Sequence, residues 1–398
     1  MTVTELFLVS TLVIFGAPYI VWRLLGRSDW APLVVVQIIG GILLGPNILG
    51  SLAPSTYGTI MNPQVLTAIN GIAWWAIMLF VWIAGIELDL REAWRKRGET
   101  GTVAAFALLM PLTLGSIAAS VLMPHFNWAG PNSAPWQVVV GVGMSCSVTA
   151  LPILILLMEN MAILRTGLGQ RILRYASLDD VAIWAVLSLI LIDVERLARQ
   201  SLFFVLFVPF SMIIRKLISS AKDEDRWIYG LLWLALCSLG ADWAGLHYMV
   251  GAFLSGAVLD SKWFKIEKMD AFRNNILISI MPFYFLSTGL KTTWEMGGAG
   301  AFVAAGILLA VSVAAKILGM VASGRILKWE LSESLLIGWL LQTKALILII
   351  FITVLLDKGI ITSDLFTTLL LVAIGSTMLT MPIVTPMLAK GRHILEKA

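Results

Sequence analysis

Long apolar stretches fill almost the whole of this 398-residue sequence, separated by short breaks rich in charge, glycine or proline. A helix that rises 1.5 Å per residue needs about 20 apolar residues to cross the hydrocarbon core of a bilayer. Charged residues make up 13% of the chain, whereas about a quarter of a soluble domain is charged. The sequence therefore predicts an all-α polytopic membrane protein with thirteen transmembrane helices. The expected spans are residues 5–24, 31–50, 67–88, 101–123, 135–158, 170–192, 201–219, 226–242, 245–261, 274–291, 298–323, 332–356 and 363–388.

Basic residues lie mostly on one side of this arrangement. With the N-terminus outside, 22 of the 28 Lys and Arg residues fall in cytoplasmic breaks or in the C-terminal tail. Basic residues prefer the cytoplasmic side of a membrane, and only Arg196, Arg199, Lys291 and Lys358 fall outside. We therefore expect an integral protein of the plasma membrane with a cytoplasmic C-terminus. The first span is expected to be retained, because no basic segment precedes it.

Two short motifs recur seven spans apart. Residues 41–46 (GILLGP) are similar to residues 251–257 (GAFLSGA), and residues 80–86 (FVWIAGI) are similar to residues 284–290 (YFLSTGL). Because seven is odd, the second copy would be inverted in the membrane. Transporters are often built from such inverted halves, although short glycine-rich similarities also arise by chance.

Very few ionisable residues fall inside the expected spans, and each is a candidate functional residue because a charge in hydrocarbon is costly. Asp179 and Asp180 lie in span six, Lys316 in span eleven and Lys344 in span twelve. Counted from the cytoplasmic flanks, Asp180 and both lysines lie roughly 13–17 Å deep, near the middle of the bilayer. We expect acids and bases to meet at this level, where an Asp–Lys ion pair lowers the cost of burying both charges.

An alternative places the acidic pair at the membrane surface. In that arrangement Ser177 caps a helix that starts there, and the lysines reach the interface. Such a span would have only fifteen residues before Asp193, which is short for a membrane helix. We therefore favour the buried arrangement.

The paired carboxylates of Asp179 and Asp180 suit a small cation. Hard monovalent cations prefer oxygen ligands, and protons compete for the same oxygens. Because competition for one site is the basis of exchange, both residues are candidate ligands of the metal cation and of protons.

Span five offers neutral oxygens at a similar depth. Thr149 lies in residues 144–152 (MSCSVTALP), where Pro152 lacks the N–H that would bond to the Val148 carbonyl. We expect the helix to open there and to bring Thr149 to the acidic pair, whereas a simple packing kink is the alternative. Lys344 is expected to neutralise the carbonyl ends of opposed broken helices.

No pattern indicates an enzyme, a catalytic residue or a resident cofactor. Cys146 and Cys237 lie in apolar stretches without metal-ligand spacing. His125, His247 and His393 fall at loops, span ends or the tail, with no nucleophile beside them. The dispersed basic residues form no patch for nucleic acid. The expected partners are therefore the lipid bilayer and transported ions.

The ordered set of motifs resembles the monovalent cation:proton antiporter-2 family, which carries the sodium/hydrogen exchanger domain. The similar stretches are residues 41–50, 83–90, 147–152, 178–182, 251–256 and 357–366. Each stretch is weak alone, but their order is specific and covers nearly the whole chain. One departure is Lys344-Ala345, where the family usually has Arg-Gly. Alanine lacks the conformational freedom of glycine, so we expect a less open break and an altered ion preference.

The resemblance implies an inverted-repeat antiporter fold with broken crossing helices, assembled as a homodimer. It implies Asp180 as the principal cation and proton site and Asp179 as the salt-bridge partner of Lys316. Thr149 would be a ligand on the broken helix, and the double Asp implies electrogenic exchange. The implied parts are a dimerisation part at about 1–100 and 226–295, a core part at about 101–192 and 298–390, and a linker helix at about 201–219.

We therefore expect a secondary active antiporter that exchanges a monovalent cation, Na+ in the first place and K+ as a second option, for protons by alternating access. One alternative is a non-transporting membrane sensor or assembly subunit on the same scaffold. Another is a sodium-coupled symporter of an organic solute, which would need more polar groups than the spans contain. Oxygen ligands alone do not reveal which cation is preferred.

Overall fold

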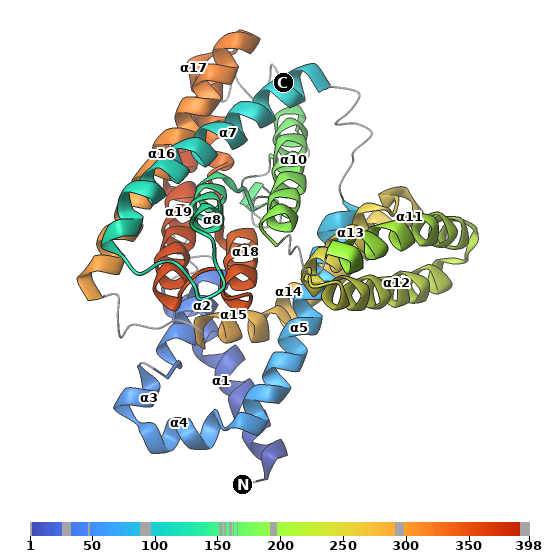
Figure 1. Cartoon of the computed structure of the whole chain (residues 1–398), viewed down its shortest axis with the longest axis vertical. Coiled ribbons are helices and arrows are strands. Elements are labelled where there is room, and N and C mark those ends of the chain that lie inside the picture. Colours follow the sequence, from blue (N-terminus) through green and yellow to red (C-terminus); the bar gives the residue numbers. More distant parts are fainter. Residues whose placement is uncertain are drawn as a thin grey trace. The chain divides into compact units, whose positions relative to one another are not determined.

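The computed structural model describes residues 2–25, 33–46, 48–87, 97–150, 154, 157–158, 161, 163–164, 166–191, 197–290 and 298–390. All regular elements in these residues are helices (Figure 1), apart from one isolated β-bridge between Ala129 and Ile361. In an apolar environment every backbone polar group must bond within the protein, and a helix achieves this within one segment. The all-α class expected from the sequence is confirmed.

Six helices of the described chain are long and apolar enough to cross a membrane. They are α1 (Val3–Leu24), α5 (Pro63–Ile86), α7 (Arg97–Leu122), α11 (Leu197–Ser220), α16 (Gly298–Leu327) and α19 (Ser363–Lys390). The chain is therefore an integral membrane protein with multiple apolar spans. Two further long helices, α10 (Gly167–Ile190) and α12 (Asp223–Trp243), overlap the sixth and eighth expected spans.

Several other expected spans are shorter or interrupted helices. The second contains α2 (Leu33–Leu43), followed by α3 (Leu49–Leu52) and α4 (Pro54–Ile60); the fifth contains α8 (Pro135–Ser147), and the ninth contains α13 (Tyr248–Ala257). The twelfth is divided into α17 (Leu331–Leu340) and α18 (Ala345–Asp357). The number of thirteen spans stays a prediction.

The expectation of one continuous tenth span was wrong. This part of the chain forms α14 (Ile266–Ser279) and α15 (Met281–Leu290), which are separated at Ile280. Pro282 has no N–H to donate, and its ring would clash with the Ile278 carbonyl of a continuous helix. The same proline is well tolerated in the first turn of α15.

The chain divides into two compact units. Unit 1 comprises residues 1–18, 40–89 and 191–290, and it contains α5 and α11 to α15. Unit 2 comprises residues 19–39, 90–190 and 291–398, and it contains α7, α8, α10 and α16 to α19. The dimerisation, linker and core roles expected for parts of the chain stay predictions.

Two close helix crossings in unit 1 depend on glycine. A Cβ atom at Gly85 on α5 would lie 2.5 Å from the Phe253 carbonyl oxygen of α13. A Cβ atom at Gly41 on α2 would lie 2.7 Å from the Leu286 carbonyl oxygen and 3.1 Å from the Gly289 Cα of α15. These distances leave no space for a side chain. The helices therefore approach this closely only because both positions are glycine.

Unit 2 encloses the C-terminal half of α8. On the neighbouring helix α7, a Cβ atom at Gly115 would lie 2.7 Å from the Cys146 Cβ of α8. The last seven residues of α8, 141–147, are all buried. The chain therefore ends a helix in the interior of unit 2, and other parts of the protein must bond to the backbone groups that the helix leaves free.

We expect Gly85→Ala to destabilise the protein by about 1–3 kcal/mol, because the added methyl group must push apart two packed backbones. Gly71 lies on the same helix and has no atom within 4 Å of an added Cβ. Gly71→Ala should therefore leave the melting temperature unchanged or raise it. Thermal unfolding in detergent, followed by tryptophan fluorescence, measures both variants. Equal melting temperatures would contradict the close crossing.

Candidate functional site

Two chain segments leave the helical conformation and cross in the interior of unit 2. Helix α8 ends at Ser147, and Val148 continues with extended backbone angles of −57° and 145°. The second break covers residues 341–344, between α17 and α18. The backbone N–H of Ala150 donates to the Thr343 carbonyl at 2.6 Å, which joins the two segments. The opening expected around Thr149 is therefore present, whereas Pro152 lies outside the described residues.

Two buried lysines bond to the carbonyl groups at the end of α8. Lys344 Nζ donates to the Cys146 carbonyl at 2.7 Å and to the Val148 carbonyl at 2.9 Å. Lys316 Nζ donates to the Ser147 carbonyl at 2.7 Å. Both lysines are fully buried in the described structure. The C-terminal end of a helix carries partial negative charge, so the two ammonium groups compensate the end of α8.

One carboxylate joins these groups. Asp179 on α10 is 1% exposed, and its Oδ2 atom lies 2.9 Å from Lys316 Nζ. The Thr149 hydroxyl lies 2.6 Å from the same Oδ2 and 2.7 Å from the Leu341 carbonyl oxygen. It can donate its single proton to either acceptor. The other oxygen of Asp179, Oδ1, is buried and accepts no hydrogen bond from the residues that the structure describes.

The structure thus brings together Thr149, Asp179, Lys316 and Lys344, four of the five residues expected to converge. Asp180 is the next residue on α10, but its side chain lies outside the described part of the chain. Helix α10 begins at Gly167, twelve residues before Asp179. The surface alternative, in which a helix starts at Ser177, therefore does not fit this helix.

The charges of the described groups at the crossing do not balance. When ionised, Lys316 and Lys344 supply two positive charges and Asp179 supplies one negative charge. Among the described residues, the groups that accept from Lys344 are backbone carbonyls. An isolated ammonium group in an apolar interior is costly, so a second anion nearby is favoured.

Two further polar residues were not singled out from the sequence. Gln342 is fully buried, and its Nε2 donates to Ser312 Oγ at 3.0 Å. Ser312 Oγ in turn donates to the Cys146 carbonyl at 2.8 Å. A signal was present, because Gln342 directly precedes Thr343 and Lys344 in an otherwise apolar segment. Ser312 on α16 thus bonds directly to the end of α8, and Gln342 supports Ser312.

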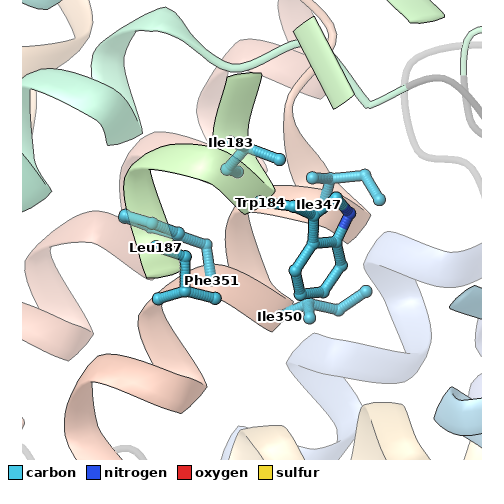
Figure 2. A pocket seen from close by; sticks show the side chains of 6 residues that line it. All are labelled: Ile183, Trp184, Leu187, Ile347, Ile350 and Phe351. Atoms are coloured by element: carbon cyan, nitrogen blue, oxygen red, sulfur yellow. The ribbon is translucent and has the colours of Figure 1, made fainter. Parts of the chain in front are cut away.

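An apolar pocket lies beyond the acidic pair along α10. Its lining residues come from α10 and α18 of unit 2: Ile183, Trp184, Leu187, Ile347, Ile350 and Phe351 (Figure 2). The space between these side chains is too small to hold a water molecule. Positions 183, 184 and 187 follow Asp180 along α10 by one and two helical turns. The six lining side chains are aliphatic or aromatic and offer no ligands to a cation.

Known membrane exchangers are similar to this chain in sequence and in fold. The family described as "Sodium/hydrogen exchanger, transmembrane" matches residues 9–390. Cation/H(+) antiporter 17 of Arabidopsis thaliana is 28% identical over 388 residues, which cover 92% of this chain and 46% of the plant protein. The Na(+)/H(+) antiporter NhaS4 of Synechocystis sp. is 24% identical over 407 residues, which cover 98% of each protein.

A solved structure agrees at the level of the fold. The sodium proton antiporter MjNhaP1 from Methanocaldococcus jannaschii matches with a TM-score of 0.60 and 14% identity, covering 97% of this chain and 95% of that chain. At this identity the likeness concerns the fold alone. The chain spans about half the length of the plant relative that it matches.

We expect Thr149→Val to destabilise the protein by about 1–3 kcal/mol, because it removes the hydroxyl that links the Asp179 carboxylate to the Leu341 carbonyl. Thr149→Ser keeps the hydroxyl and should retain most of the stability. Thermal unfolding of the purified variants in detergent distinguishes the two substitutions. A valine variant as stable as the wild type would show that this link is not needed.

Proposed function

Because the chain belongs to the sodium/hydrogen exchanger family, we propose that it is a secondary antiporter that exchanges a monovalent cation, Na+ or K+, for protons. The observation that carries the proposal is the buried Asp179 carboxylate, held between Lys316 and Thr149 where two broken helices cross. A membrane protein rarely keeps such groups in its interior unless ions or protons use them. The family is one of membrane exchangers and not of enzymes.

Asp180 is proposed as the principal site for the cation and for protons. It follows Asp179 on α10, and its carboxylate would balance the second positive charge of the two lysines. The cation would bind to Asp180, with the Thr149 hydroxyl and nearby backbone carbonyls as neutral ligands. Protonation of Asp180 would remove its charge and release the cation. Because the site holds either a cation or protons, the two fluxes are coupled.

Asp179 is proposed to exchange partners during this cycle. In the proposed cycle the Asp179 carboxylate starts paired with Lys316, whose Nζ lies 2.9 Å from Asp179 Oδ2. Protonation of Asp179 and its release from Lys316 would add a second charge movement and make the exchange electrogenic. Lys344 would stay on the carbonyl end of α8 throughout.

The proposed architecture has thirteen spans in two inverted repeats. The glycine crossings of unit 1 support it: α2 packs against α15, and α5 packs against α13. The motif of α2 is repeated in α13, and the motif of α5 is repeated in α15. A twofold axis that relates the repeats would interchange these two crossings. The pairing of helices therefore follows the symmetry that the repeated motifs require.

We further propose a homodimer in the plasma membrane, with the N-terminus outside and the C-terminus in the cytoplasm. Residues at about 101–192 and 298–390 would form a moving core. Residues at about 1–100 and 226–295 would form the dimerisation part, and a linker helix at about 201–219 would join them. The core would carry the site between the two sides of the membrane by alternating access.

The non-transporting sensor is disfavoured by the cost of the site. A sensor that had lost exchange would have no use for a buried carboxylate paired with a buried lysine, and apolar residues of similar size often replace such a pair without loss of stability. The symporter is disfavoured because the pocket that follows the acidic pair along α10 is lined by apolar side chains and has no space even for a water molecule.

The purified chain in proteoliposomes should move protons when a cation gradient is imposed. The membrane potential is clamped, and a pH-sensitive dye is enclosed in the vesicles. Addition of Na+ or K+ should change the dye signal. Li+ is tested in the same way. Asp180→Asn should abolish the signal, because it removes the carboxylate for which a cation and a proton compete. Asp260→Asn is the control, since Asp260 is a helix cap that asparagine can replace. Wild-type exchange by the Asp180→Asn variant would end the proposal.

Lys316→Ala should leave exchange possible but change its dependence on voltage, because Asp179 would no longer be held by a permanent positive charge. The initial rate of exchange is measured at a series of imposed potassium-diffusion potentials, with Na+ as the driving cation. Lys262→Ala, at an exposed position in unit 1, serves as the control. Identical voltage responses of Lys316→Ala and the wild type would refute the role of the ion pair.

A further inference from the structure

A charged cluster ties together the starts of three helices in unit 2. Arg171 on α10 pairs through Nη1 with Glu333 Oε1 on α17 at 2.7 Å and through Nε with Glu99 Oε1 on α7 at 3.1 Å. Tyr175 donates a hydrogen bond to Glu99. The Arg171 guanidinium lies over the Trp329 ring, 4.7 Å from its centroid. We call these five residues the clasp.

The clasp is better shielded than an ordinary surface ion pair. The side chains of Arg171 and Glu333 are 19% and 17% exposed, whereas that of Glu99 is 33% exposed. Partly buried charges are screened less by salt, and the planar guanidinium fixes the direction of each bond. The Arg171–Glu333 pair can therefore hold two helices in a defined register.

The clasp and the candidate site are joined by the same two helices. On α10, Asp179 follows Arg171 by eight residues, and in the α17 segment Leu341 follows Glu333 by eight residues. At 1.5 Å per residue, both intervals correspond to roughly 12 Å along the helix axis. The Thr149 hydroxyl bridges the far ends of these intervals, because it contacts both Asp179 Oδ2 and the Leu341 carbonyl. The two helices are thus linked at two levels, and the levels are separated by the same distance on each helix.

Apolar side chains fill the space between the two levels. One buried cluster contains Ile172 and Ala176 of α10 together with Leu336, Ile337 and Leu340 of α17. Apolar contacts contribute no hydrogen bonds of fixed direction. The polar links at the two ends therefore add a directional constraint on the register of α10 against α17.

We propose that Arg171 is a positioning residue for ion exchange, which sets the axial register of α10 against α17 and so holds Asp179 beside the Leu341 carbonyl. This inference rests on the proposed function, since it gives Arg171 a role in the same site. The Thr149 hydroxyl oxygen lies 2.6 Å from Asp179 Oδ2 and 2.7 Å from the Leu341 carbonyl oxygen, and a shift along the axis would lengthen these distances beyond hydrogen-bond range. A shift of about 1 Å at a reacting site is enough to impair it.

The test compares the apparent KM for the cation with the maximal rate in proteoliposomes, with Na+ and K+ titrated separately. Arg171→Gln and Glu333→Gln should each raise the KM by about three- to tenfold, because coupling through packed elements is of this size. The double variant should be no worse than either single variant, because both remove the same link. The maximal rate per folded protein should change less than the KM.

Three further variants separate positioning from general stabilisation. Glu99→Gln removes the pairing to α7 and keeps the α10–α17 pair, so it should change the KM less than Glu333→Gln. Arg171→Lys keeps the positive charge but lacks the planar guanidinium that bonds Glu99 and Glu333 in two directions, and it should give an intermediate KM. Asp223→Asn removes the charge that pairs with Arg226, Lys265 and Lys268 in unit 1 and should leave the KM unchanged. Folding of each variant is checked by its melting temperature.

The outcomes are distinguishable from failure of the proposed function. No exchange by the wild type in the same vesicles would refute the function itself. A wild type that exchanges, with folded Arg171→Gln, Glu333→Gln and Arg171→Lys variants of unchanged KM, would overturn the positioning role alone. Equal KM increases for Glu99→Gln and Glu333→Gln would also overturn it, because they would point to a loosened unit and not to the register of α10 and α17.

Discussion

A helix that ends inside an apolar unit leaves carbonyl groups without partners, and the chemistry of unit 2 follows from that constraint. The end of α8 presents the carbonyls of Cys146, Ser147 and Val148, and Lys316 and Lys344 donate to all three. Two buried lysines in turn need negative charge nearby. Asp179 supplies one such charge. The buried carbonyls thus require the lysines, and the lysines require the Asp179 carboxylate.

This dependence makes the site responsive to ions. When every buried charge relies on a partner, adding or removing one proton or one cation changes the stability of the remaining pairs. A packed interior responds to such a change by adopting a second arrangement more readily than by deforming gradually. The two broken helices and the helix that carries Asp179 and Asp180 are the elements that such a change would affect first. The clasp at Arg171 ties α10, one of these elements, to α7 and α17.

Much of the candidate site could be predicted from the sequence, because charges in apolar segments are rare and stand out. Thr149, Asp179, Lys316 and Lys344 were expected near one level, and the structure brings them together. The break at Pro282 was missed, because hydropathy is averaged over a window and is insensitive to one lost N–H. The clasp was missed because Arg171, Glu99 and Glu333 look like ordinary flanking charges of three different spans.

By itself the sequence determined the membrane class, the all-helical architecture and the small set of ionisable residues in the interior. These properties depend on composition summed within single segments. Only the tertiary structure decided which carbonyl each lysine bonds, that Thr149 bridges Asp179 and Leu341, and that Arg171 links α10 to α17. Hydrogen-bonded partners here lie 30, 137 and 192 residues apart in the chain. A hydrogen bond requires its atoms within about 3 Å, and only the packing of distant segments sets such distances.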